Sequence, residues 1–150
     1  MSRSSFKFAP VNAEGVVADL DMPATAYRAL LKMRALSEHG GRIEIEQSSL
    51  AQQLGISRPA VTAALRTLDL AQLVKKERNG VYRINAMLAG YATPADALEA
   101  VRAMPDEERL TDPDFVSRYH RAVDAYRDQL AEKRRKREHQ KRRETLKAVS

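Results

Sequence analysis

The sequence predicts a mainly α-helical chain with one small β-hairpin and a long C-terminal helix. Three observations lead to this fold class. Apolar residues recur every three or four positions over much of the chain, as on the buried face of a helix. The dipeptide Asn79-Gly80 separates two short runs of strand-forming residues, which predicts a hairpin. Near the C-terminus, apolar residues alternate at spacings of three and four, which is the pattern of a long helix with one apolar seam.

Composition excludes several classes of protein. The 150 residues are enough for one domain with an appendage, 43% of them are apolar and 31% are charged. No run approaches the ~18 apolar residues that cross a bilayer, and no hydrophobic stretch follows the N-terminal Met-Ser-Arg-Ser-Ser that could act as a secretion signal. The chain has no cysteine, which rules out disulfides and thiolate sites. We therefore expect a soluble protein of the bacterial cytoplasm, associated with nucleoid or plasmid and not with a membrane.

The positive charge is concentrated at the C-terminal end. Residues 131–150 hold nine Lys or Arg and three Glu, which accounts for the whole net charge of +6. Such a concentration favours a polyanion such as nucleic acid, although a tail that only keeps the protein soluble would look the same. The tail cations that we expect to hold phosphates without base specificity are Lys133, Arg134, Arg135, Lys136, Arg137, Lys141, Arg142 and Arg143.

Four segments follow one another along the chain. Residues 1–22 are weakly patterned and are expected to form a short strand or an arm. Residues 23–90 carry the clearest motifs and form the expected DNA-binding domain. Residues 91–112 are acidic and are expected to be a linker with one short helix. Residues 113–150 are expected to form the long helix with its basic tail.

Within the second segment, the elements can be predicted in order. A helix is expected from Pro23 to Leu36, and Gly40-Gly41 ends the helical pattern. The alternating run 43–46 predicts a short half-buried strand. The sequence Ser49-Leu50-Ala51-Gln52 has the form of a capping box and predicts the start of a short helix.

A tight turn and a second helix are expected next. Gly55 can adopt the left-handed conformation that ends a helix. Ser57 can cap the following helix, and Pro59 is tolerated in its first turn. The spacing therefore predicts two short helices joined by a turn.

The second of these helices has two different faces. At 100° per residue, one side carries the apolar residues Val61, Ala64, Leu65 and Leu68. The opposite side is small and polar and carries Arg58 and Arg66, as expected for a helix that enters a major groove. A plain helical hairpin inside a core is the alternative, but it would need no particular outer face. The DNA-binding candidates on this helix are Ser57, Arg58, Pro59, Thr62, Ala63, Arg66 and Thr67.

The hairpin adds a second candidate surface. A two-residue type I′ turn at Asn79-Gly80 would place residue 76 opposite residue 83 and residue 74 opposite residue 85. In that register one face carries three cations and no acid, and would lie along a phosphate backbone or in a minor groove. The candidates on this hairpin are Lys76, Arg78, Asn79, Gly80 and Arg83.

The run 54–68, followed by Leu-Val-Lys-Lys at 73–76 and Gly-Val-Tyr-Arg-Ile-Asn at 80–85, resembles the winged helix-turn-helix family, including MarR-type regulators. The pattern of residues 80–85 is similar more narrowly to the wing strand of RepL-type plasmid replication proteins. Those proteins usually have proline after the asparagine, where this chain has Ala86. The resemblance covers residues 23–90 and implies DNA binding through the recognition helix and the wing.

The C-terminal helix is expected to be divided in two. Its first half carries an apolar seam that packs either on its own domain or on the same helix of a second subunit in a homodimer. Its second half is polar all round and is expected to contact phosphates. The dimerisation candidates are Val116, Tyr119, Val123, Tyr126 and Leu130.

We expect no enzymatic activity, metal or cofactor. The three histidines are scattered and the sequence contains no phosphate-binding loop or dinucleotide motif. The expected function is that of a sequence-specific double-stranded DNA-binding protein, either a plasmid replication initiator or a replication accessory factor. The alternatives are a transcriptional regulator of its own or a neighbouring operon, and a protein-interaction scaffold. Other replication or transcription proteins are expected as partners.

Overall fold

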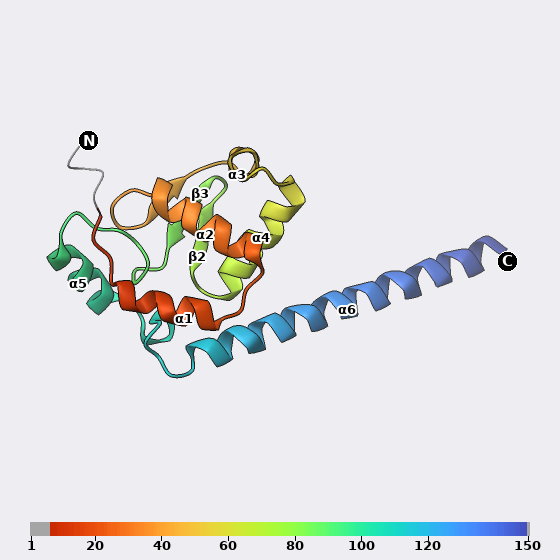
Figure 1. Cartoon of the computed structure of the whole chain (residues 1–150). Coiled ribbons are helices and arrows are strands. Elements are labelled where there is room, and N and C mark those ends of the chain that lie inside the picture. Colours follow the sequence, from red (N-terminus) through yellow and green to blue (C-terminus); the bar gives the residue numbers. More distant parts are fainter. Residues whose placement is uncertain (1–6, 150) are drawn as a thin grey trace.

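The structure is a computed structural model that describes residues 7–149, and most of these residues are helical (Figure 1). The expectation of a mainly helical chain with a small hairpin and a long C-terminal helix is confirmed. None of the helices in residues 7–149 combines the length and apolar character that a bilayer crossing requires. The α-helices are α1 (Glu14–Asp19), α2 (Ala24–Leu36), α3 (Gln47–Leu54), α4 (Arg58–Leu70), α5 (Pro94–Ala103) and α6 (Phe115–Val149), with 3₁₀ turns η2 (Val11–Ala13) and η3 (Asp106–Glu108).

Helix α4 is amphipathic and packs against α2 and α3 through one side. Its buried residues are the four that the helical spacing predicts. Helix α3 contributes Leu50, Ala51 and Leu54 to the same core. Because a helix can bury only one stripe of its surface in this way, the opposite face of α4 is left outside the core. The buried residues of α4 are Val61, Ala64, Leu65 and Leu68, and those of α2 are Ala26, Ala29, Leu30 and Met33.

The turn between α3 and α4 has the predicted construction. Gly55 is left-handed, with φ 66° and ψ 34°. The hydroxyl oxygen of Ser57 accepts a hydrogen bond from the backbone N–H of Ala60 at 3.2 Å and caps α4. Pro59 lies in the first turn of α4, where it removes no helical hydrogen bond.

The predicted start of α3 is wrong by two residues. The helix begins at Gln47, so Ser49 lies inside it and does not act as the cap. Glu46 precedes the helix in an extended conformation, and its carbonyl oxygen accepts the first helical hydrogen bond from the N–H of Leu50. Glu46 makes no side-chain cap, so the usual sequence signal for a helix start is absent here.

The three strands form one antiparallel sheet in the order β1-β3-β2. Strand β1 (Arg42–Glu44) follows the two glycines that end the helical pattern after α2, and its central residue Ile43 is buried, as the alternating pattern predicts. Strands β2 (Val74–Arg78) and β3 (Val81–Ile84) form the hairpin with Asn79-Gly80 at its turn.

The register of the hairpin agrees with the prediction beside the turn, where Arg78 lies opposite Val81, and differs from it by one residue farther along the strands. Of the two turn residues only Gly80 has a positive φ, so the turn is not of type I′. The pairing is irregular between Lys76 and Arg78, and Lys76 lies opposite Tyr82 instead of residue 83. This register places Val74 opposite Ile84 with both side chains buried, whereas the predicted register would have turned Val74 outward.

The shifted register separates the cations of the hairpin. Lys75 lies opposite Arg83, while Lys76 lies on the other face of the sheet. Arg83 also forms an ion pair with Glu77, Nε to Oε1, at 2.5 Å. The prediction of a face that joins Lys76, Arg78 and Arg83 without an acid is therefore wrong.

The N-terminal segment packs on the helices. Residues 11–19 form η2 and α1, and the backbone of Phe8 bridges to Tyr91 through a 2.8 Å hydrogen bond. The first six residues of the expected arm at 1–22 lie outside the described residues. The buried residues of this segment are Ala13, Val17, Leu20 and Met22.

The acidic segment 91–112 contains α5 and η3 and also contributes to the core, through Ala97, Met104 and Leu110. The side chain of Asn85, at the end of β3, donates to the carbonyl oxygens of Gln72 and Glu108 at 3.0 and 2.8 Å. This amide therefore fastens the segment to the sheet.

Helix α6 leaves the body of the protein along a single continuous axis (Figure 1). Phe115 and Tyr119 are buried at its start, and Val116 and Val123 pack against the core. Residues 131–149 are all exposed. The helix thus has a first part anchored on the body, which was one of the two alternatives for its apolar seam, and a projecting basic part.

The two glycines before β1 test how closely the chain at Gly41 packs against Ile84 and Ala89. Both have φ near +90°, but a Cβ on Gly41 would lie 2.8 Å from the Cβ of Ala89 and 3.0 Å from the carbonyl oxygen of Ile84, while one on Gly40 would meet nothing within 4 Å. We expect Gly40→Ala to lower the free energy of unfolding by about 1–2 kcal/mol through backbone strain. Gly41→Ala should cost a further ~1–3 kcal/mol through the steric clash. Urea denaturation measures both, and equal losses would contradict this packing.

Candidate nucleic-acid interface

The outward face of α4 is accessible. Arg58, Pro59, Ala63 and Arg66 are exposed, as is the capping residue Ser57. Thr62 and Thr67 are half-buried at the edges of this face. The structure therefore places all seven sequence candidates of the second helix on or beside one surface, with small side chains between the two arginines.

Thr62 is held by a polar contact inside the domain. Its hydroxyl donates to the Oε1 atom of Gln47 at 2.9 Å, and the Nε2 atom of Gln47 donates to the hydroxyl of Tyr82 at 3.3 Å. These bonds link α4, the start of α3 and strand β3. The Thr62 hydroxyl thus positions the three elements relative to one another and is not free to contact a base.

A polar hollow of about 600 Å³ lies between the hairpin and the first turns of α3 and α4. It joins four sequence candidates from two elements, namely Arg58 of α4 and Lys76, Asn79 and Gly80 of the hairpin. The sequence does not indicate that Glu46 and the first two residues of α3, Gln47 and Ser48, line this hollow, because their position depends on the helix start and the hairpin register. The full lining is Glu46, Gln47, Ser48, Arg58, Lys76, Asn79, Gly80 and Tyr82.

The cations around this surface differ in whether an acid already neutralises them. Arg83 is paired with Glu77 and Lys75 with Glu108. Within residues 7–149, four predicted DNA-binding cations of α4 and the hairpin have side chains that make no hydrogen bond or ion pair, although Arg42 and, to a smaller extent, the charge of Arg78 lower the pKa of the Glu44 carboxyl. These four are Arg58 and Arg66 on α4, and Lys76 and Arg78 on the hairpin.

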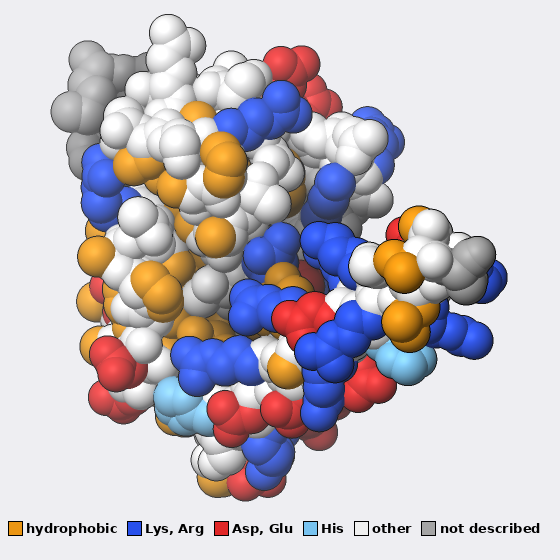
Figure 2. Space-filling model, turned by 90° about the vertical axis from the view of Figure 1, so that its right-hand side faces the viewer, with side chains coloured by type: hydrophobic (Ala, Val, Ile, Leu, Met, Phe, Trp, Pro, Cys, Tyr) orange, Lys and Arg blue, Asp and Glu red, His pale blue; other side chains and the backbone are white. Residues whose placement is uncertain are grey.

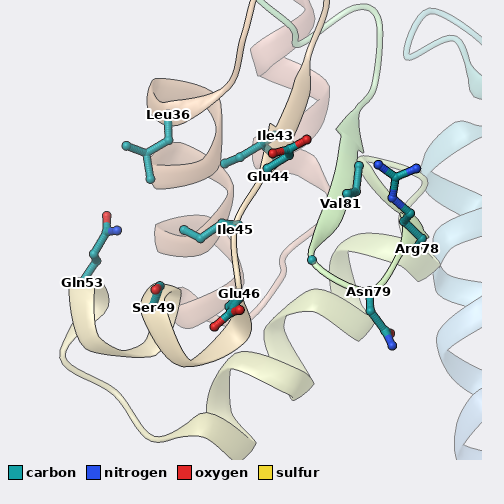
Figure 3. A pocket seen from close by; sticks show the side chains of 11 residues that line it. Leu36, Ile43, Glu44, Ile45, Glu46, Ser49, Gln53, Arg78, Asn79 and Val81 are labelled. Atoms are coloured by element: carbon teal, nitrogen blue, oxygen red, sulfur yellow. The ribbon is translucent and has the colours of Figure 1, made fainter.

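A second hollow, of about 660 Å³, opens on the other side of the hairpin tip (Figure 3). Two carboxylates, from Glu44 and Glu46, and one cation, Arg78, line it. The first hollow has one carboxylate, Glu46, and two cations, Arg58 and Lys76, so it suits a polyanion better. Arg42 hydrogen-bonds Glu44 at 2.5 Å and holds the pKa of that carboxyl below its usual value. The other lining residues of the second hollow are Leu36, Ile43, Ile45, Ser49, Gln53, Asn79, Gly80 and Val81.

Helix α6 lies beside the outward face of α4. The guanidinium carbon of Arg66 is 5.1 Å from the ring centroid of Tyr126, within the range of a cation–π contact. Helices α4 and α6 are also in contact along their backbones. The long helix is thus part of the surroundings of the candidate interface.

Most residues of the predicted dimerisation seam pack against the body of their own chain. Val116, Tyr119 and Val123 pack on the core, and burial raises the pKa of the Tyr119 hydroxyl. Tyr126 and Leu130 are half-buried. Of the two alternatives for this seam, packing on its own domain is the one seen in the single chain, and a homodimer stays a prediction.

The basic tail extends the positive surface beyond the body. Figure 2 shows Lys and Arg side chains along the projecting helix and on the adjoining face of the body. All eight tail candidates are exposed. Arg135 contacts Glu132 at 3.4 Å, one turn away on the same helix, which is a weak exposed pair.

The described residues form no metal-binding group on this surface. No three His, Asp or Glu side chains among residues 7–149 come together in a group that could hold a metal ion. Comparisons with protein-family models, curated proteins and solved structures found no match for the chain.

The contact between α4 and α3 can be tested without a ligand. Thr62→Val keeps the shape of the side chain but leaves the Oε1 atom of Gln47 without its donor, and should lower the free energy of unfolding by about 0.5–1.5 kcal/mol. Thr67→Val is the matched control, because the Thr67 hydroxyl bonds only to the carbonyl of Ala63 within the same helix. We expect the control to change stability by less than about 0.5 kcal/mol in urea titrations. Equal effects would show that the Gln47 contact contributes nothing.

Proposed function

We propose that this chain is a sequence-specific double-stranded DNA-binding protein of the winged helix-turn-helix type. The observation that carries the proposal is a set of three cations without an acid partner. Arg58 and Arg66 lie on the exposed face of α4, and Lys76 lines the polar hollow beside it together with Arg58. Cations that are left without an acid partner on one surface favour a polyanionic ligand.

Helix α4 is proposed to enter the major groove with its outward face. Small side chains such as Ala63 allow the backbone to approach the base edges, and Arg66 lies near the middle of the face where it can reach a base. Arg58 and Lys76 border the polar hollow beside this face and are proposed to hold the phosphate backbone. The hairpin then acts as the wing.

The basic half of α6 is proposed to add affinity without base specificity. The helix projects from the side of the body where α4 lies (Figure 1), and neutralising phosphates with its cations would release counterions. This contribution should depend strongly on salt.

The similarity of residues 80–85 to the wing strand of RepL-type proteins directs the proposal toward plasmid replication, as an initiator or an accessory factor. A transcriptional regulator would use the same DNA-binding surface, and a protein-interaction scaffold would not need unpaired cations there. Selection of binding sites from random duplexes tests DNA binding itself. Footprinting on plasmid and chromosomal DNA then tests the role, since protection of an origin supports replication and protection of a promoter supports regulation.

The hairpin cations provide a paired test. Lys76→Ala should weaken binding to all duplexes and reduce the slope of log affinity against log salt by roughly one. Arg83→Ala should have a smaller effect on both quantities, because Glu77 already neutralises this arginine. Fluorescence anisotropy over a salt series measures both variants, and a larger effect of Arg83→Ala would contradict the observed register.

The tail can be tested by charge neutralisation. Replacing the five consecutive cations at 133–137 with glutamine should flatten the salt dependence while leaving the selected sequence preference unchanged. Arg102→Gln, outside the proposed interface, removes one positive charge against five in the tail variant, and should shift affinity and salt slope by far less than one fifth of the tail effect. A changed base preference in the tail variant would mean that the tail reads sequence, contrary to the proposal.

A further inference from the structure

The guanidinium of Arg66 is the one cation of the proposed interface that rests on an aromatic ring among the described residues. Its carbon atom lies 5.1 Å from the centroid of Tyr126, at a distance typical of a cation–π contact. No hydrogen bond or ion pair to the Arg66 side chain is seen within residues 7–149. The group is therefore held by a contact that leaves its hydrogen-bond donors unused.

The geometry of such a contact matters for recognition. A guanidinium that lies flat on a ring leaves its N–H donors pointing outward in its own plane. Two parallel donors in this plane match the O6 and N7 acceptors of guanine in the major groove. A side chain whose freedom is already restricted also loses less entropy when it binds.

Tyr126 is itself held in place by the body of the protein. It lies on α6 one helical turn beyond Val123, which packs against the core, and the helix is anchored earlier by the buried residues Phe115 and Tyr119. The backbone of α6 at Tyr126 is thus positioned relative to α4 by contacts distant in sequence from the recognition helix. A loose tail could not support Arg66 in this way.

We propose that Arg66 and Tyr126 form one guanine-reading unit, in which Tyr126 is a positioning residue that α6 brings to the recognition helix. This inference rests on the proposed DNA binding. It assigns the ligand as the major-groove edge of a guanine, and it makes the first half of α6 part of the base-reading site.

The experiment begins with a duplex site selected from random DNA by the full chain. Tyr126→Leu keeps an apolar side chain but removes the ring, and Tyr126→Phe is the matched control that keeps it. We expect Tyr126→Leu to lower affinity for the selected site about two- to fivefold, the change that corresponds to a cation–π contact at an exposed position. Tyr126→Phe should bind like the unmodified chain. Circular dichroism checks that both variants retain their helix content.

A change in the DNA tests the ligand itself. Replacing the preferred guanine by 7-deazaguanine removes its N7 acceptor, and should weaken binding by the unmodified chain and by Tyr126→Phe. The same replacement should have little effect on Arg66→Ala and a reduced effect on Tyr126→Leu. Such a loss confined to one base position is not expected from a residue that only stabilises the fold.

The outcomes separate the two proposals. If the unmodified chain binds no duplex at low salt, the proposed function is wrong and the inference is wrong with it. If the chain binds a selected site but Tyr126→Leu binds equally well or more tightly, or if 7-deazaguanine has no effect at any preferred guanine, only the guanine-reading unit is overturned.

Discussion

The packing of α4 on one side is the constraint on which the rest of this structure depends. Val61, Ala64, Leu65 and Leu68 are fixed against α2 and α3, so the rotation of the helix about its axis is determined. This rotation turns Arg58 and Arg66 outward. The glycine turn before the helix and the hairpin after it are then placed on either side of one exposed face.

Local chemistry made much of the fold predictable from the sequence. The turn at Gly55 and the cap at Ser57 follow from residue types that satisfy the backbone within a few positions. The start of α3 at Gln47 was not predictable, because Glu46 provides no side-chain cap there. The register of the hairpin beyond its turn was missed for a different reason. The irregularity between Lys76 and Arg78, which pairs the buried Val74 with Ile84, has no local sequence signal.

The sequence predicts the exposed arginines of the candidate site but not their contacts with other elements. Helical spacing places Arg58 and Arg66 on the outer face without knowledge of any tertiary contact. It does not indicate that Glu77 neutralises Arg83, that Gln47 engages Thr62, or that Tyr126 lies beneath Arg66. Each of these contacts joins segments whose meeting depends on the assembled core, so no short sequence window contains the information.

The projecting half of α6 has a consequence for its own folding. Residues 131–149 are exposed on every side, so this half gains no free energy from a core and its helix–coil balance resembles that of an isolated peptide. Like charges four residues apart, as at Lys133 and Arg137, shift this balance toward the coil by about 0.2–0.5 kcal/mol per pair. Dissolved ions screen that repulsion and so favour the helix, while the same ions compete with any polyanion for the cations. The shape of the tail and its attraction for an anionic surface therefore respond to salt in opposite directions.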